Sequence, residues 1–167
     1  FYGGLIGGVA GGYFAARRMK ESFVELMDAA APCIAVGHGI GRVGCFLAGC
    51  CYGRPMAPPL GLLMPQALGA PHDVALFPVQ LLEAALNISL GIFLLIYSRR
   101  RREEGQVAGL YLVAYAGIRF CVEFLRYDAV RGFAGALSTG QWMSILAWHA
   151  GLLLFARVSV IDIGLNG

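Results

Sequence analysis

Residues 109–126 read GLYLVAYAGIRFCVEFLR, an apolar run that carries charged side chains in its second half. The wider segment 107–125 holds nine Val, Leu, Ile or Phe residues, each worth roughly 0.3–0.6 kcal/mol on insertion into a bilayer. Arg119 and Glu123 each cost roughly 2.5–3.5 kcal/mol in such a helix, so the apolar gain barely cancels them. An apolar helix that keeps these charges indicates an interior cavity with a chemical task, and a pair that only locks two helices is the alternative.

The charged residues of this segment fall on one helical face. Arg119, Glu123 and Arg126 are spaced i, i+4 and i+7, and Tyr115 lies one turn before them. At a rise of about 1.5 Å per residue, Arg119 lies about 10 Å below the outer end of its helix. This face therefore presents cations at a depth where lipid head groups begin.

A second apolar segment, 28–50, repeats that spacing with His38, Arg42 and Cys45. Arg42 lies about 12 Å below its own outer end, so two arginines at similar depth predict an anion site. Guanidinium groups suit a phosphate through paired hydrogen bonds, which makes a phospholipid head group the expected anion. His38 is a candidate base for this site, with packing or hydrogen bonding as its alternative role. Further polar residues on other spans are Gln80, Glu83, Asn87, Gln141 and Ser144.

The composition predicts a membrane protein. Of 167 residues, 58% are hydrophobic and 14% charged, against roughly 45–50% and 25% in an average soluble domain. Apolar runs near the length that crosses about 30 Å of hydrocarbon lie at 1–16, 28–50, 78–97, 107–126 and 139–156. We therefore expect an all-α integral membrane protein of about five transmembrane helices, with a small extracytoplasmic loop region, as one transmembrane domain over 1–167. Residue 1 is Phe rather than Met, so we expect an N-terminal part to precede this chain.

Basic residues are unevenly divided between the two ends of these spans. Eight of the 13 lie in 17–20, in 98–104 and at Arg157, whereas the other ends hold Arg54, Arg126 and Arg131. The positive-inside rule places the Arg-rich ends in the cytoplasm. The Pro- and Gly-rich segment 51–77 and the segment 127–138 then lie outside.

Glycines form two rows on the first span. Gly3, Gly7 and Gly11 repeat every four residues, and so do Gly4, Gly8 and Gly12. Such rows let another backbone approach closely, so we expect them to serve helix packing. Access for a bulky lipid along a glycine-lined face is the alternative.

The five cysteines do not form a disulfide framework. Cys33, Cys45 and Cys121 lie inside apolar runs, where a cysteine acts as a small hydrophobic residue, and Cys50 and Cys51 adjoin a loop. A metal site built from the last two with Cys45 and His38 is the alternative. Because the spacing matches no paired CxxC pattern, we expect neither a metal nor a cofactor.

Five blocks resemble one known family when they are taken together. They are GGLIGG at 3–8, GRVGCFLAGCCYGRP at 41–55, FPVQLLEA at 77–84, GLYLVAYAGIRFCVEFLR at 109–126 and LSTGQWMSI at 137–145. In this order they resemble bacterial prolipoprotein diacylglyceryl transferase, over nearly the whole chain. The resemblance implies an enzyme of the bacterial plasma (inner) membrane. It would transfer diacylglyceryl from phosphatidylglycerol to the thiol of a lipobox cysteine on a prolipoprotein, with no nucleic-acid partner.

The resemblance also implies site residues. Arg42, Arg119, Glu123 and Arg126 match the polar residues of the family's active cavity, and Gly44, Gly53, Gln80 and Glu83 match as well. We therefore expect Arg42, Arg119 and Glu123 to be catalytic, together with His38, whose position one turn from Arg42 makes it the candidate base. The expected substrate-binding residues are Arg126, Tyr2, Gly44, Cys45, Cys50, Gly53, Gln80 and Glu83.

The chain departs from the family's GRxGNFxNxE motif. Cys45 and Ala48 stand where the family has Asn, Cys50 stands where it has Glu, and Tyr2 stands where a His commonly precedes GGLIG. Two alternatives to the transferase follow from these departures. One is a non-catalytic membrane subunit that keeps the lipid pocket and binds a membrane partner protein. The other is a thiol-redox or metal-binding membrane protein that uses Cys45, Cys50 and Cys51.

Overall fold

The computed structural model describes residues 2–64, 71, 73–100, 103–127, 133–135 and 137–165. Its five helices are α1 (Tyr2–Met19), α2 (Phe23–Leu47), α3 (Val79–Ser98), α4 (Gln106–Glu123) and α5 (Thr139–Leu165). Its four strands are β1 (Leu62–Leu63), β2 (Ala75–Leu76), β3 (Phe133–Ala134) and β4 (Leu137–Ser138). They form two antiparallel pairs, β1 with β2 and β3 with β4. The described chain is mostly helical, and these short pairs correct the expectation of a purely helical protein.

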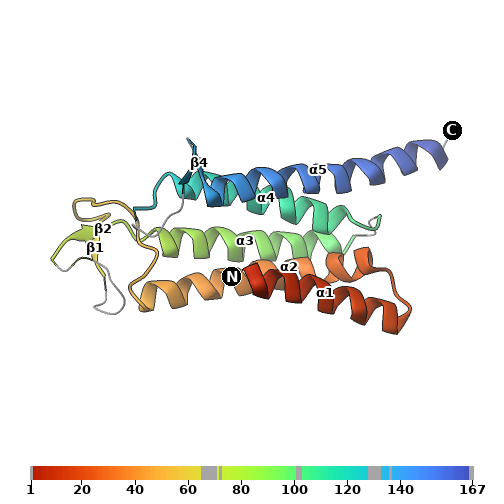
Figure 1. The fold of residues 1–167 in the computed structure, drawn as a ribbon, viewed down its shortest axis with the longest axis horizontal. Coiled ribbons are helices and arrows are strands. Elements are labelled where there is room, and N and C mark those ends of the chain that lie inside the picture. Colours follow the sequence, from red (N-terminus) through yellow and green to blue (C-terminus); the bar gives the residue numbers. More distant parts are fainter. Residues whose placement is uncertain are drawn as a thin grey trace.

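The helices lie side by side, and their connections alternate between the two ends of the bundle (Figure 1). The α1–α2 and α3–α4 turns lie at the same end as the C-terminus of α5. The strands lie at the opposite end. Segments 17–20 and 99–100 therefore share one end of the molecule. Arg101, Arg102, Arg131 and the side chain of Arg157 lie outside the described residues.

Helix α2 begins five residues before the expected span because its first turn is capped. Ser22 is the N-cap residue, and its hydroxyl accepts a hydrogen bond from the Glu25 backbone N–H at 3.5 Å. Ser-x-x-Glu is the sequence of a capping box, in which an acidic residue also favours the positive end of the helix dipole. Helix α5 likewise continues to Leu165, beyond the expected end at 156.

Asp28 of α2 caps the start of α4 across the bundle. Its two carboxylate oxygens accept hydrogen bonds from the backbone N–H groups of Gly105 and Ala108, each at 2.7 Å. Gly105 is the N-cap residue of α4 and has no side chain to do this, so the exposed donors of the first turn need a partner from elsewhere. The pair of bonds fixes the end of α4 against α2.

Glycines set the close approach of two helix pairs. A Cβ built on Gly39 would lie 2.6 Å from Ile88 Cγ1 and 2.9 Å from the Ala84 carbonyl oxygen, both on α3. In α5, a Cβ on Gly151 would lie 2.9 Å from the carbonyl oxygen of Gly109 in α4. Only hydrogen fits at such separations. The close pairs α2–α3 and α4–α5 therefore hold the site residues in register.

Apart from Gly12, the glycines of the two rows on α1 do not contact another helix of the described chain. A Cβ on Gly3, Gly4, Gly7, Gly8 or Gly11 would meet nothing within 4 Å. At Gly12 it would meet Met27 and Phe23 of α2 at 3.5 Å, an ordinary contact. The expectation that these rows pack a helix is therefore not met within the described residues. The glycines that do pack helices lie in α2, α3, α4 and α5.

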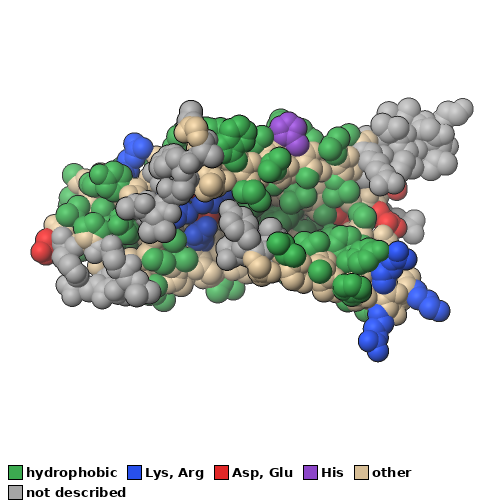
Figure 2. Space-filling view, viewed as in Figure 1, with side chains coloured by type: hydrophobic (Ala, Val, Ile, Leu, Met, Phe, Trp, Pro, Cys, Tyr) green, Lys and Arg blue, Asp and Glu red, His purple; other side chains and the backbone are tan. Residues whose placement is uncertain are grey.

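Apolar side chains cover much of the outer surface (Figure 2). On α3, Ile92, Phe93, Leu95 and Ile96 are each about half exposed or more, while Gln80, Glu83 and Asn87 are buried. In a water-soluble protein the apolar side chains of a helix are buried and its polar side chains are exposed. The reverse arrangement on α3 matches a helix surrounded by lipid. Among the described residues, α2 and α3 are the two helices long and apolar enough to cross a membrane by length and composition.

Candidate active site

The first ion pair of the site joins α2 to α3. Arg42 Nε lies 3.1 Å from Glu83 Oε1, and the two side chains are 21% and 3% exposed. A carboxylate as buried as Glu83 requires a cation at contact distance, because desolvation of an isolated charge is costly. Glu83 is thereby an internal partner of Arg42, one α-helical turn after Gln80 on the same face of α3.

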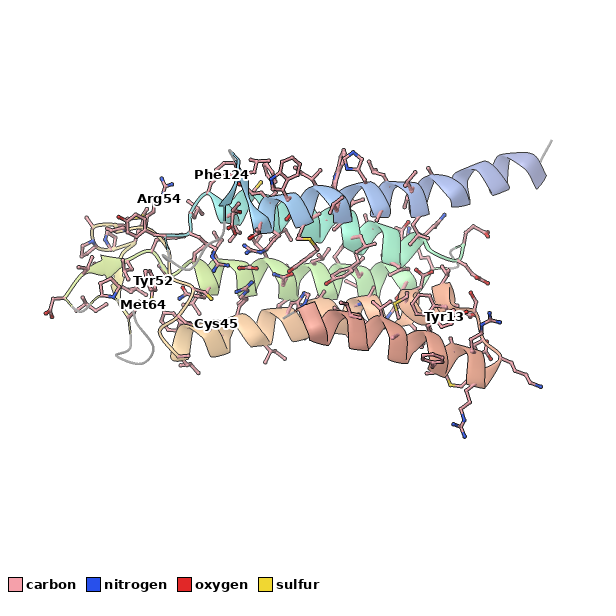
Figure 3. All side chains as sticks on the ribbon, viewed as in Figure 1. Tyr13, Cys45, Tyr52, Arg54, Met64 and Phe124 are labelled. Carbon is pink, nitrogen blue, oxygen red and sulfur yellow. The ribbon has the colours of Figure 1, made fainter. Side chains whose placement is uncertain are left out.

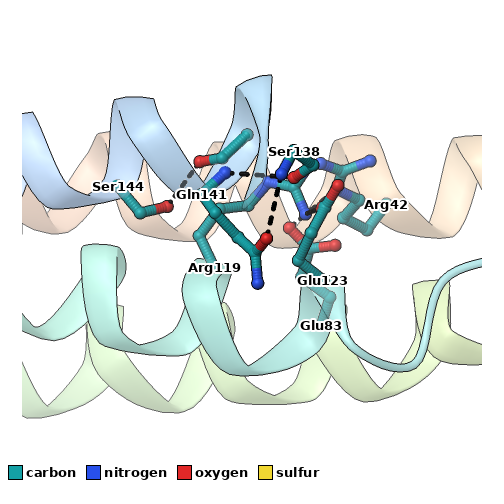
Figure 4. Close-up of polar contacts among 8 residues, drawn as sticks. Arg42, Glu83, Arg119, Glu123, Ser138, Gln141 and Ser144 are labelled. Atoms are coloured by element: carbon teal, nitrogen blue, oxygen red, sulfur yellow. Dashed lines mark hydrogen bonds and ion pairs between the residues drawn. The ribbon is translucent and has the colours of Figure 1, made fainter. Parts of the chain in front are cut away.

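The second ion pair lies within α4. Arg119 Nη1 is 2.6 Å from Glu123 Oε2, the i, i+4 contact that the spacing predicts, and Glu123 is 4% exposed. The first turn of α5 covers this pair: a Cβ on Gly140 would lie 3.1 Å from Arg119 Nη2 and 3.3 Å from Glu123 Oε2. Figure 4 shows both ion pairs beside the start of α5. Gly140 therefore leaves room for the guanidinium group.

Both arginines line one cavity of about 700 Å³ between α2, α4 and α5. Tyr115 also lines it and lies close enough to Arg42 and Arg119 to experience the charge of both. Towards the Arg-rich end of the bundle the lining becomes apolar, with Phe23, Met27, Ala108 and Leu154 among its residues. The space-filling view shows this hollow, with basic side chains at one side of it (Figure 2). The cavity thus has a cationic end and an apolar end.

Each arginine has its own acidic partner, as the helix-locking alternative required. Arg42 and Arg119 nevertheless share one cavity. An ion pair that serves only as a lock gains nothing from a neighbouring cavity of this size. The arrangement therefore suits the recognition of an anion that enters between the two guanidinium groups.

His38 lines the same cavity and forms a contact with two tyrosines of α4. Its Nδ1 lies 3.1 Å from the Tyr111 hydroxyl, and its ring centroid lies 5.0 Å from that of Tyr115. The two tyrosine rings stack at 5.6 Å. The hydrogen bond at Nδ1 fixes the ring orientation. When Nδ1–H donates to Tyr111, the neutral ring keeps Nε2 as a proton acceptor.

The polar residues of α3 form a buried row behind Arg42. Gln80, Glu83 and Asn87 are at most 2% exposed. Gln80 Nε2 donates to the Cys50 carbonyl oxygen at 2.7 Å, and Asn87 Nδ2 donates to the Glu83 carbonyl oxygen at 2.8 Å. This row connects the loop after α2 to the acidic partner of Arg42.

The start of α5 is closed by a reciprocal cap. The Gln141 backbone N–H donates to Ser138 Oγ at 3.2 Å, and the Ser138 backbone N–H donates to Gln141 Oε1 at 3.0 Å. This Ser-x-x-Gln capping box explains the burial of two polar residues and positions Gly140 over the second ion pair. Ser144, one turn later, lines the cavity and donates to the Gly140 carbonyl oxygen at 2.8 Å.

Three further expected site residues, Gly44, Gly53 and Arg126, lie towards the strand-bearing end. Gly53 and Arg126 form an antiparallel bridge, and Arg126 is 9% exposed. A Cβ on Gly53 would lie 2.6 Å from the Phe77 carbonyl oxygen, so this position admits only glycine. Gly44 has open space around it. The side chain of Tyr2 lies outside the described residues.

Three cysteines come together at the end of α2. The Sγ atoms of Cys45, Cys50 and Cys51 all lie within 4.8 Å of one another, and each residue is partly buried. Burial, followed by the charges of the neighbouring thiols of Cys51 and Cys45, raises the pKa of the Cys50 thiol to about 11. Cys50 is therefore protonated at neutral pH when no cation is bound. Figure 3 shows Cys45 at the same end of the molecule as Tyr52, far from Tyr13.

Sequence reasoning missed two residues of this site, Tyr111 and Gly140. Tyr111 lies one turn before Tyr115, so the helical period that selected Tyr115 also reaches it. Gly140 stands inside the Ser-x-x-Gln pattern that marks a helix start. Its contact with Arg119 depends on how α5 packs against α4, which no local pattern specifies.

Comparisons with known proteins identify the family. Residues 1–157 match the profile of prolipoprotein diacylglyceryl transferase. The phosphatidylglycerol–prolipoprotein diacylglyceryl transferase 2 of Clostridium perfringens is 40% identical over 154 residues, or 92% of this chain and 60% of that protein. The corresponding proteins of Clostridium tetani and Geobacter sulfurreducens are each 38% identical, over 92% and 98% of this chain. The chain spans 60–63% of the length of these relatives. The resemblance drawn from the motifs is confirmed, and the chain belongs to the prolipoprotein diacylglyceryl transferase family.

Proposed function

We propose that this protein transfers a diacylglyceryl group from phosphatidylglycerol to the cysteine thiol of a prolipoprotein, in the bacterial plasma membrane. The observation that carries the proposal is the single cavity lined by Arg42 and Arg119 at one end and by apolar residues at the other. A phospholipid has the same two parts, an anionic head and apolar chains. The names of the relatives supply the two substrates, phosphatidylglycerol and prolipoprotein.

The arginines would bind the phosphate that leaves. In this reaction the thiol sulfur forms a bond to a glyceryl carbon, and the bond between that carbon and the phosphate oxygen breaks. Glycerol phosphate departs with the electron pair, so negative charge increases at the oxygen between the two guanidinium groups. Fixed cations in a site shielded from water stabilise that charge more than water does.

His38 would accept the thiol proton. The family's usual His is replaced by Tyr2 here, and His38 is an imidazole in contact with the cavity. Tyr111 holds Nδ1, which leaves Nε2 as the base when Nδ1 carries the proton. Glu123 would hold Arg119 in place rather than react, because its carboxylate already contacts that guanidinium group.

We further propose that all five helices cross the membrane, with segments 17–20 and 98–104 in the cytoplasm. The clustering of both basic segments at one end of the bundle supports this arrangement. The charges on α4 lower its apolarity, yet they face the interior, where the lipid does not meet them. The cationic end of the cavity then lies in the outer half of the bilayer, where a secreted prolipoprotein can reach it.

The test uses the full-length protein in vesicles that contain phosphatidylglycerol and a synthetic peptide with a lipobox cysteine. We expect a thioether product, detected as a mass increase of one diacylglyceryl group, together with release of glycerol phosphate. Arg119→Ala should lower the rate by about 100-fold or more, the loss typical of one oxyanion donor. Cys33→Ser, at an exposed position of α2 outside the cavity lining, is the matched control and should retain the wild-type rate. Vesicles of phosphatidylcholine should give no product.

The second candidate function is a non-catalytic subunit that binds phosphatidylglycerol and a membrane partner protein. The replacement of the family's Asn, Asn and Glu by Cys45, Ala48 and Cys50 favours it. The same assay separates the two functions. Binding of the lipid without any product, in protein that folds and keeps its thiols reduced, would support the subunit and contradict the transferase.

A further inference from the structure

The cysteine cluster Cys45, Cys50 and Cys51 is built by the backbone. Helix α2 ends in a Schellman motif, in which the Cys50 N–H donates to the Cys45 carbonyl oxygen at 3.1 Å and the Gly49 N–H to that of Phe46 at 3.0 Å. Gly49 has a φ of 66°, the left-handed conformation that this motif requires. The motif brings Cys50 back over the last turn of the helix, beside Cys45. Cys45 and Cys50, five residues apart in the sequence, therefore lie next to each other.

Two further features hold the cluster in place. Cys51 has a φ of 59°, a conformation that costs a residue with a Cβ roughly 1–3 kcal/mol and that persists where the surroundings impose it. The adjoining chain is tied to the bundle, since Gln80 donates to the Cys50 carbonyl oxygen at 2.7 Å and the Tyr127 N–H donates to that of Tyr52 at 3.1 Å. The three thiols thus occupy a supported loop.

Three convergent thiols suit a soft metal ion. Zinc binds cysteine sulfur at about 2.3 Å with tetrahedral geometry, which places two such sulfur atoms about 3.8 Å apart. Sulfur atoms already within 4.8 Å reach that separation by small side-chain rotations. The metal would displace the thiol protons and neutralise the repulsion among the three thiolates.

We propose that Cys45, Cys50 and Cys51 bind Zn²⁺ as three thiolate ligands and leave its fourth position for the cysteine thiol of the substrate. Among the described residues, no fourth Cys, His, Asp or Glu joins the cluster. Three protein ligands with one open position are the pattern of a catalytic rather than a structural zinc site. The expectation of no metal rested on sequence spacing, which does not show the Schellman motif.

The assignment of the fourth zinc position to the substrate rests on the proposed transfer reaction, because that reaction needs an activated substrate thiol. Cys45 lies on the α2 face that also carries His38 and Arg42, seven residues after the first and three after the second. It is close enough to Arg42 for the charge of its thiolate to act on the guanidinium group. A thiol that binds Zn²⁺ loses its proton, here to water, and remains a nucleophile. After its sulfur has formed the thioether, the product carries no charge and is a weaker ligand that leaves.

The first experiment tests the metal alone and does not depend on the transfer reaction. Full-length protein is purified in detergent with reductant and without chelator, and its zinc content is measured; Co²⁺ then replaces the zinc. We expect about one metal per chain and the thiolate-to-cobalt absorption of a tetrahedral sulfur site. Cys45→Ser, Cys50→Ser and Cys51→Ser should each weaken Co²⁺ binding at least about tenfold. Cys33→Ser and Cys121→Ser, at exposed helix positions, are the matched controls and should not.

Absence of metal in protein with five free thiols would overturn the site. A disulfide within the cluster after purification with reductant, seen as a loss of two hydrogens by mass, would also overturn it. Wild-type Co²⁺ binding in all three variants of the cluster would do the same.

The second experiment tests the fourth ligand. A peptide with a single cysteine is added to the Co²⁺ form, and its Ser counterpart serves as control. The cysteine peptide alone should intensify the thiolate-to-cobalt absorption. A metal site whose spectrum does not change would overturn the substrate role, and failure of the transfer assay with a normal spectral change would count against the proposed function instead.

Discussion

Arg42 and Arg119 are the central residues of the candidate site because each forms an ion pair with a fixed acidic partner and also lines the cavity. Glu83 and Glu123 neutralise part of their charge, which makes burial tolerable, and the guanidinium groups still line the space where an anion fits. Lysine at either position would keep the charge and lose the planar fork. The structural role of these arginines and their proposed role in binding a phosphate can therefore be separated by substitution.

The first prediction concerns that separation at Arg42. Arg42→Lys should weaken phosphatidylglycerol binding by about 10-fold or more, since a charge-assisted hydrogen bond is worth roughly 1.5–3 kcal/mol. Arg42→Ala should weaken binding further and also destabilise the fold, because Glu83 would be left buried without a cation. The Arg42→Ala, Glu83→Gln double variant should recover stability but not binding. Lipid binding to the detergent-purified protein and thermal unfolding measure the two effects, and full affinity in the Lys variant would contradict the prediction.

A second residue-scale prediction concerns Tyr111, a positioning residue for His38. Tyr111→Phe keeps the ring that stacks on Tyr115 and removes the 3.1 Å hydrogen bond to Nδ1. We expect the transfer rate to fall about tenfold or more, with a changed pH profile of kcat/KM, because the proton is no longer held at Nδ1. Tyr13→Phe, at an exposed site on α1, is the control. A rate lowered equally at every pH would indicate a purely structural role.

At the scale of helices, close packing through glycine decides how the polar faces meet. Helix α3 can bring Glu83 to Arg42 only because α2 presents Gly39 at the contact, where a methyl group would meet a backbone carbonyl. The capping contacts act in the same way, since Asp28 ties the start of α4 to α2 and Ser138 closes the start of α5. These contacts set the depth of each site residue within the bundle.

The element-scale prediction compares two glycines of α2. Gly39→Ala should destabilise the protein by about 1–3 kcal/mol, the usual cost of overpacking, because its Cβ would lie 2.6 Å from Ile88. Gly37→Ala, two residues away, meets nothing within 4 Å and should be neutral or slightly stabilising, since Ala favours a helix. Unfolding in detergent with denaturant measures both. Equal destabilisation by the two variants would show that the α2–α3 contact does not depend on Gly39.

For the molecule as a whole, sidedness is the property that determines which substrates reach the cavity. A cysteine introduced by Arg99→Cys should react with a membrane-impermeant maleimide only after the cells are opened, because the Arg-rich end is expected in the cytoplasm. Leu60→Cys, on the strand-bearing side and 61% exposed, should react in intact cells. Labelling at each position is quantified by mass spectrometry against the parent protein. Reaction at position 99 in intact cells would reverse the proposed orientation.

Several features of this protein could be predicted from local sequence patterns. The composition predicted a membrane protein, which the family assignment supports, and the motifs identified the family. The helical period placed Arg119 one turn from Glu123, and they lie 2.6 Å apart. Such contacts follow from the sequence because both partners share one helix, whose geometry repeats with a known period.

Contacts between helices could not be predicted in this way. The pairing of Arg42 with Glu83 and the cap that Asp28 provides for α4 each join residues of two helices whose spacing carries no signal. Helix rotation and depth decide these contacts. They depend in turn on where glycines allow close approach and where caps end each helix. The sequence by itself determined the family, the helical character and the polar faces, and only the tertiary structure decided which faces share a cavity, because packing rather than period brings them together.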